Sequence, residues 1–273
     1  MDIWRKYNGA IIPVLPPHIK VLTSYDEIKK IMKSKSVFFA RWTSDFDSKN
    51  KTEFWYIIND LPLHIDSYSA NTRSKIRRGL SKIDVKKVSK HEILLNGYNV
   101  YNASFDRYRS FTKPDSKDVF LNAIKGLDGI REFWGVYLKD TDELIGYSQN
   151  KISHNCCEYD EIRFHPSFLK LYSSYVLFYQ MNQYYLNEKN FKYVNDGARS
   201  ISHNTNIQQF LIDKFKFRKA YCRLHILNSK RLDLVIKLLY RFKWLINRIN
   251  LGLFLKISVL LEQEKIIRSF EKR

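Results

Sequence analysis

The sequence is poor in glycine and proline, with 9 and 6 among 273 residues, so long flexible linkers are not expected. Its three cysteines are Cys156, Cys157 and Cys222. An odd number without a spaced framework argues for a reducing compartment, here the cytoplasm. No set of Cys and His has the spacing of a zinc site, so no metal is expected. The first ten residues lack an apolar signal core, and we expect no export.

Several other features are absent. The chain has no Gly-x-x-x-x-Gly-Lys-Ser/Thr loop, which argues against a P-loop nucleotidase, and no Gly-x-Ser-x-Gly elbow, which argues against a serine hydrolase. It also lacks an uncharged apolar run of the roughly 20 residues that a transmembrane helix needs. What is present is a hydrophobic fraction of 44% with 15% aromatic residues, enough for a packed core in one large or two small domains.

Positive charge is in excess, because 47 Lys and Arg stand against 28 Asp and Glu, a formal net charge of +19. This balance predicts an anionic partner: a phosphate-bearing cofactor, nucleic acid, an acidic lipid or an acidic glycan. The charge alone does not choose among them.

The stretch from Glu143 to Phe217 carries the most specific pattern, which is strand, strand, helix, strand, helix. The second strand ends before Pro166, which lacks the donor that a sheet requires. Apolar residues then recur at helical spacing over 171–187. A third strand follows at 191–195, a helix near 204–214, and a last strand over 216–227.

This order resembles the acyl-CoA-binding half of the GNAT acyltransferases, in which a strand ends at a proline turn and a basic, glycine-rich loop opens a helix. The resemblance implies a mixed α/β fold: a mostly antiparallel sheet flanked by helices. It also implies acetyl-CoA or another acyl-CoA as co-substrate. The cofactor-binding residues would be Phe164, Lys170, Tyr172, Ser173, Ser174, and Asn204 or Asn206.

Four positions depart from the family pattern. Tyr172 and Ser174 replace the two loop glycines, and Lys216 replaces the glycine before the phenylalanine that opens the last strand. Ile212 stands where many members carry a proton-donating tyrosine. The loop also has a physical interpretation without the family: a helix N-terminus presents unpaired N–H groups that bind phosphate. The alternative is a plain helix start after a proline turn.

An amine acceptor must lose a proton before it attacks a thioester, so a base is expected beside these strands. The first candidates are Asp160 and Glu161, and the second are His165 and Asp196. Strand alternation would place Glu158 and Asp160 on one face and Glu161 on the other. Ordinary strand-edge acids are the alternative for each one. Arg199 is a candidate for holding phosphate or the acceptor.

The segment 69–90 is strongly basic. Arg73, Arg77 and Arg78 fall within one helical turn, so they are expected to converge on one anion of the substrate. Residues 72–80 also resemble a helix of the Fem-type peptidyltransferases, which are built from GNAT-like units and take an aminoacyl group from tRNA. A solvated helix face is the alternative.

The tail, 228–273, is predicted to be a basic amphipathic helical extension of a domain that spans 1–227, with 143–227 as its acyl-CoA-binding half. Gly252 is expected to interrupt the helix. Packing on the body of the protein, pairing in a homodimer and peripheral membrane contact through 232–261 all remain open.

The sequence thus predicts a cytoplasmic acyltransferase that moves an acyl group from acyl-CoA to an amine of an amino sugar, an amino acid, or a glycan- or lipid-linked acceptor. It would be soluble or peripheral at the inner face of the membrane. Two alternatives remain. One is a Fem-like transferase that uses aminoacyl-tRNA. The other is a non-catalytic protein that binds nucleic acid or a membrane surface.

Overall fold

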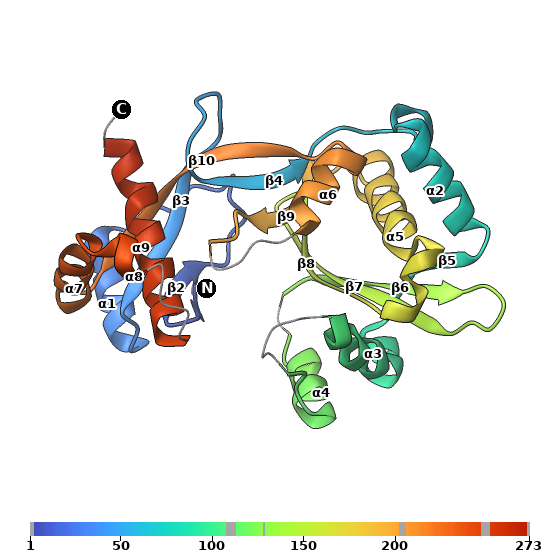
Figure 1. Cartoon of the computed structure of the whole chain (residues 1–273), viewed down its shortest axis with the longest axis horizontal. Helices are drawn as coiled ribbons and strands as arrows, with labels where there is room; N and C mark the ends of the chain where they lie inside the picture. The colour runs from blue at the N-terminus through green and yellow to red at the C-terminus, as the bar shows by residue number, and fades with distance from the viewer. Residues whose placement is uncertain (1–2, 108–112, 128, 202–205, 247–251, 272–273) are drawn as a thin grey trace. The chain divides into compact units, whose positions relative to one another are not determined.

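The computed structural model describes residues 3–107, 113–127, 129–201, 206–246 and 252–271 (Figure 1). The chain forms two compact units. The first comprises Met1–Ile57, Ala198–Asn206 and Lys219–Arg273, and the second comprises Ile58–Gly197 and Ile207–Arg218. The chain first passes from one unit to the other inside β4 (Trp55–Asn59).

The first unit is built on four strands in the order β1-β2-β3-β10. Strands β1 and β2 form an antiparallel pair, β2 and β3 pair in parallel, and β3 and β10 pair antiparallel. The bounds are β1 (Trp4–Tyr7), β2 (Ala10–Pro13), β3 (Phe39–Ser48) and β10 (Arg218–Asn228).

Four helices belong to the first unit: α1 (Tyr25–Ser34), α7 (Lys230–Tyr240), α8 (Lys243–Ile246) and α9 (Gly252–Glu271). Helix α1 begins at a capping box in which Ser24 and Glu27 satisfy each other's backbone N–H groups. Its buried Ile28 and Met32 pack with Trp4. In α9, Ile266 packs with Phe54 and two residues of β10, so the tail shares a core with the strands.

The second unit has the strand order β9-β8-β7-β6-β5. Every neighbouring pair is antiparallel except β8 and β9, which run parallel. The bounds are β5 (Ile83–Val88), β6 (Arg131–Leu138), β7 (Leu144–Ser153), β8 (Cys156–Phe164) and β9 (Tyr193–Ala198). A mixed, mostly antiparallel sheet is therefore confirmed.

Helices cover both faces of this sheet. Figure 1 shows α3 (Lys90–Ser104) and α4 (Lys117–Lys125) on one face, and α2 (Ala70–Leu80) and α5 (Ser173–Asn182) on the other. Helix α6 (Asn206–Phe215) precedes β10, and single turns lie at η1 (Ile65–Ser67) and η2 (Phe105–Arg107). The aromatic side chains of α3 belong to the core, because Tyr101 packs with Phe120 and Phe133.

Two predicted helices end earlier than their patterns suggest. The basic segment is helical only to Leu80, so its later lysines, Lys86 and Lys87, lie on β5. The helix predicted over 171–187 is α5 followed by a π-helical turn, η4 (Gln183–Glu188). In the tail, the described break lies at 241–242, between α7 and α8. Helix α9 begins at Gly252, but residues 247–251 lie outside the described residues, so an interruption at Gly252 stays a prediction. The tail groups with β1–β3 and β10, and a domain boundary at 227 stays a prediction.

Two positions occupied by glycine in the GNAT pattern keep a glycine-like backbone here. Tyr172 has a φ of 64° and Lys216 a φ of 61°. This left-handed region is unfavourable for residues with a Cβ. The turns before α5 and β10 therefore have a backbone conformation that favours glycine, although the residues there are Tyr and Lys.

Replacing Lys216 by glycine is expected to raise the free energy of unfolding by about 0.5 kcal/mol, because the relief of left-handed strain exceeds the extra entropy of glycine in the unfolded chain. Lys214→Gly, inside α6, is the matched control and should lower stability by about 1 kcal/mol. Urea unfolding of both variants measures the difference. If both variants were less stable than the wild type, the Lys216 side chain would contribute more stability than its left-handed backbone costs.

Candidate functional site

The site is built around the place where β8 and β9 separate. These parallel strands pair only from Cys156–Glu158 to Tyr193–Asn195. Beyond this point β8 continues to Phe164, and its register with β9 has ended. A strand edge that leaves its neighbour offers N–H and C=O groups to an extended ligand.

A β-bulge lies on β8 at the same level. Gln149 of β7 is opposite Glu161, whereas the next residue, Asn150, is opposite Tyr159, so Asp160 is the extra residue. The bulge breaks the alternation of side chains. Tyr159 donates a hydrogen bond to Asn182 of α5, but Arg163, four residues later, lies over the Tyr101 ring of α3. The prediction from strict alternation over 158–161 is therefore wrong.

Asp196 is the residue that follows the last pair of β9. Asn195 holds the strand end in place: its side chain donates to the carbonyl of Cys157 at 3.2 Å and accepts from the N–H of Gly197 at 3.0 Å. Gly197 has a φ of +80° and turns the chain there. Burial, with the charge of Glu158 second, raises the pKa of Asp196 to about 7. A carboxylate with such a pKa suits general base catalysis near neutral pH.

The other candidate bases have partners that hold them in place. Asp160 forms an ion pair with Arg131 and accepts from Gln149, and Glu161 pairs with Arg163 at 2.8 Å. His165 caps the 3₁₀ turn η3 (Pro166–Leu171), where its Nδ1 accepts from the N–H of Ser167 at 3.4 Å. These contacts are structural, and a catalytic role for the three residues stays a prediction.

The predicted cofactor loop is the turn η3 and the start of α5. Lys170 is exposed, Ser174 is half-buried, and Ser173 is fully buried. The Ser173 hydroxyl has no hydrogen-bond partner within the described structure. An unpartnered buried hydroxyl at a helix N-terminus is compatible with a ligand oxygen arriving there. Phe164 packs over Gly146 of β7.

Helix α2 packs against this loop. A Cβ at Gly79 would lie 2.4 Å from Val176 and 3.2 Å from the carbonyl of Leu171, so the glycine allows the two helices to approach closely. Arg78 then lies over the ring of Tyr172, 5.0 Å from its centroid. The structure thus brings together residues that the sequence assigned to substrate and to cofactor.

The three arginines of α2 do not converge. Arg73 donates to the carbonyls of Asp66 and Tyr68, and Arg77 lies 3.9 Å from the carboxylate of Asp66. Lys75 of α2 also reaches this region. Its Nζ lies 3.3 Å from the hydroxyl of Tyr175, in the first turn of α5. Sequence reasoning placed Lys75 in the basic segment but did not choose it.

The remaining predicted residues lie elsewhere. Arg199 belongs to the first unit, where it donates to the carbonyl of Glu53 and lies 3.6 Å from Glu262. Asn206 is the exposed first residue of α6, and Asn204 is outside the described residues. Their roles stay predictions.

A buried polar network was also missed. The hydroxyl of Tyr185, on the π-helical turn, accepts from Trp134 and donates to Glu132, which pairs with Lys87 at 2.7 Å. Burial raises the pKa of Tyr185, so the hydroxyl stays protonated. The network depends on the π-helical turn that positions Tyr185. The local sequence around Tyr184-Tyr185 does not predict a π-helix, so the network could not be predicted.

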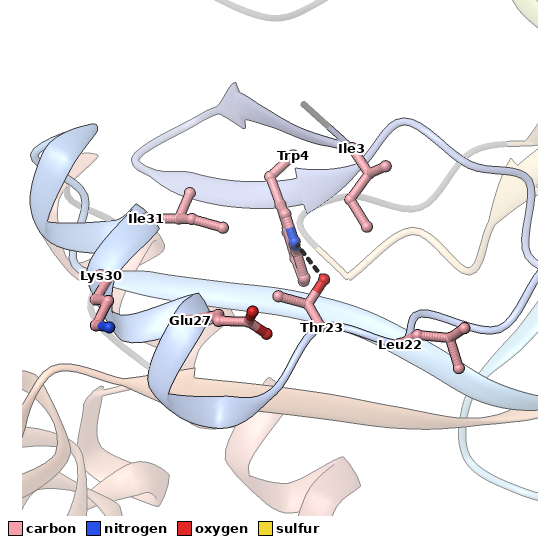
Figure 2. Close-up of a pocket in the computed structure, with 7 residues that line it drawn as sticks. All are labelled: Ile3, Trp4, Leu22, Thr23, Glu27, Lys30 and Ile31. Atoms are coloured by element: carbon pink, nitrogen blue, oxygen red, sulfur yellow. Dashed lines mark hydrogen bonds between the residues drawn. The ribbon is translucent and has the colours of Figure 1, made fainter. Parts of the chain in front are cut away.

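The first unit has an open pocket of about 580 Å³ (Figure 2). Trp4 forms one wall and donates its indole N–H to Thr23 at 3.1 Å. The lining residues are Ile3, Trp4, Leu22, Thr23, Glu27, Lys30 and Ile31. None of the sequence-predicted site residues lines this pocket.

Two absences concern the described part of the chain. No group of three or more His, Cys, Asp or Glu side chains in these residues is arranged to hold a metal ion. Among the described helices, none has the length and apolar character needed to cross a bilayer.

No family model matches the chain, and no curated protein matches its sequence. Solved structures do match. FemX is 11% identical, with a TM-score of 0.56, over 80% of this chain and 81% of its own. L-PGS from Bacillus licheniformis is 12% identical, with a TM-score of 0.53, over 95% and 84%. A tandem GNAT protein from the clavulanic acid biosynthesis pathway aligns more loosely, 10% identical with a TM-score of 0.43, over 81% and 75%. The chain has a GNAT-like fold with similarity to Fem-type proteins.

Proposed function

We propose that the chain is an acyltransferase that moves an acyl group from acetyl-CoA or a longer acyl-CoA to an amine. The observation that carries this proposal is the position of the Asp196 carboxyl at the point where β8 and β9 separate. Burial raises the pKa of this carboxyl to about 7, which supports its role as a base. The GNAT-like fold supports a transferase of this general type.

Each part of the site has a role in this proposal. The free edge of β8 holds an extended donor by backbone hydrogen bonds, and the start of α5, with Lys170, Ser173 and Ser174, holds its phosphates. Asp196 accepts a proton from the acceptor ammonium. The neutral amine then bonds to the acyl carbon, and the thiolate leaves with the electron pair of the broken C–S bond. The nitrogen loses its second proton, and the thiolate takes up that proton.

The acceptor is proposed to be an amino sugar, an amino acid, or a glycan- or lipid-linked amine. Arg77 and Arg78 of α2 are the candidates for binding its anionic groups, because both are cations on the helix that packs against the loop.

An aminoacyl group carried by tRNA is the second candidate donor. The favouring observation is that FemX and L-PGS match most of this chain. The basic helix α2 would then contact phosphates of the nucleic acid. The same proton acceptor serves either donor, because both reactions end in an amine attacking an activated carbonyl.

Calorimetric titration with acetyl-CoA and a longer acyl-CoA tests the first donor. We expect saturable binding that Ser174→Trp abolishes, because an indole would fill the start of α5, and that Lys170→Ala weakens about tenfold through loss of one phosphate contact. Asn122→Trp, on the exposed side of α4, is the matched control and should bind as the wild type does.

Absence of binding for both thioesters would overturn the acyl-CoA donor. Transfer from charged tRNA to an amine would then be measured. Failure of that reaction as well would leave a non-catalytic anion-binding protein.

A further inference from the structure

Helix α7 has apolar side chains on two sides. One side packs inside the first unit, where Ile236 is buried against Leu261 of α9 and the partly buried Leu232 and Leu239 join the same cluster. Figure 1 shows α7 and α9 side by side. The opposite side of α7 carries further large apolar residues that this cluster does not use.

The outer side forms a continuous stripe. Leu234, Leu238 and Phe242 are spaced by four residues, so they lie in one row along the helix and the turn that follows it. They are 72%, 61% and 51% exposed. Val235 lies beside this row on α7, and Trp244 lies on the next helix, α8; they are 49% and 63% exposed. Single exposed apolar residues are ordinary on protein surfaces, but a continuous row of them marks an interaction surface.

Cations border this outer stripe. At 100° per residue, Lys230, Lys237 and Arg241 form a second row beside the leucines. Lys237 pairs with Asp233 at 2.8 Å, and Lys230 and Arg241 are exposed. The outer face of α7 therefore combines apolar and basic side chains, and an exposed indole follows it on α8.

We propose that an anionic membrane surface binds the outer face of α7 (Leu234, Val235 and Leu238, with Lys230) together with Arg241, Phe242 and Trp244, which follow it. Such a surface satisfies both rows, because the apolar stripe enters the acyl boundary while the cations meet lipid phosphates. Trp is favoured at this interface. A second copy of the same face would bring like charges together, since the chain carries a net charge of +19.

This contact is peripheral, and it does not depend on the identity of the acyl donor. Its test measures binding to vesicles and needs no activity. Failure of acyl-CoA binding and failure of membrane docking are thus separate results.

Vesicle co-sedimentation of the full chain, with and without phosphatidylglycerol in phosphatidylcholine, is the experiment. We expect binding to the anionic vesicles that survives salt high enough to screen surface charge. The variant Leu234→Ser/Leu238→Ser/Phe242→Ser should lose this salt-resistant binding at least about tenfold. Trp244 should show a blue-shifted emission with anionic vesicles, and Trp244→Phe should remove that change.

Two matched controls separate the stripe from general properties of the chain. Leu95→Ser/Val119→Ser/Ile130→Ser removes three apolar residues that are 60%, 51% and 71% exposed on the second unit, and should bind as the wild type does. Lys230→Glu/Arg241→Glu should weaken binding about tenfold more than Lys20→Glu/Lys49→Glu, which changes the net charge equally.

Several results would overturn the proposal. Equal binding by the stripe variant and the wild type is one, and equal loss in a variant and its matched control is another. A wild-type dimer that the stripe variant dissociates, with vesicle binding unchanged, would assign the face to a second copy of the chain.

Discussion

Asp196→Asn is expected to lower the rate of acyl transfer by roughly 10² to 10⁴, the usual contribution of a general base. In the wild type the rate should rise with pH through about 7, because Asp196 accepts a proton only in its ionised form and its pKa lies there. The amide cannot accept the proton, so the variant should lose this step of the pH profile.

The same substitution should increase stability, which distinguishes it from a variant that merely folds badly. The pKa of Asp196 is raised from 3.8 to about 7 in the folded state, so the folded chain binds more protons than the unfolded chain between these values. Stability contributed by the protonated carboxyl is present below pH 4 and is lost as pH rises toward 7. Above that, Asp196→Asn should exceed the wild type by ~1–3 kcal/mol.

The measurement is urea unfolding at a series of pH values, paired with the rate of thiol release in the presence of an acceptor amine. Asp140→Asn, at an exposed position, is the control and should change neither quantity. An unchanged pH–rate profile in Asp196→Asn would remove Asp196 from the mechanism. An unchanged dependence of stability on pH would mean that the carboxylate ionises normally in the fold.

Phe215→Ala is expected to cost about 3–5 kcal/mol of stability, because it empties a fully buried aromatic site. Phe215 is 0% exposed. Its ring lies between those of Tyr68 and Phe178, each 5.7 Å away, and it also contacts Tyr175 and Phe210. The cluster joins α6 to α5 and to the turn before α2.

Thermal or urea unfolding measures this cost. Phe38→Ala removes a ring that is 66% exposed and should change stability by no more than about 0.5 kcal/mol. A loss at Phe215 of less than about 1 kcal/mol would show that the surrounding rings collapse into the space.

Elements whose cues are local were predictable from the sequence. Pro166 ended β8, helical spacing gave α5, and the family pattern located two special turns. Tyr172 and Lys216, which stand at two glycine positions of the GNAT pattern, both have a positive φ.

Features set by pairing between strands were not predictable. The bulge at Asp160 exists because Gln149 and Asn150 of β7 pair with residues on either side of it, and a single strand does not contain that information. The ion pair of Asp160 with Arg131 likewise requires β6 and β8 to be placed. Asp196 was the last of the bases proposed from sequence, since its raised pKa results from burial.

The three arginines of α2 separated for a related reason. Helical spacing brings them near one another, but each side chain follows its nearest partner: backbone carbonyls for Arg73, Asp66 for Arg77 and the ring of Tyr172 for Arg78. Sequence spacing predicts which residues are neighbours on a helix, whereas the surrounding elements determine where their side chains point.

Two free thiols lie next to the point where β8 and β9 separate, and their reactivity can measure how often the strands open there. Cys156 and Cys157 pair with Tyr193 and Val194, one step before the strands part, and both are buried. Burial raises the pKa of the Cys157 thiol, so it is a poor nucleophile until the strands open. The rate at which a thiol reagent labels this pair therefore measures how often β8 and β9 separate locally. A ligand that contacts both strands would slow the labelling.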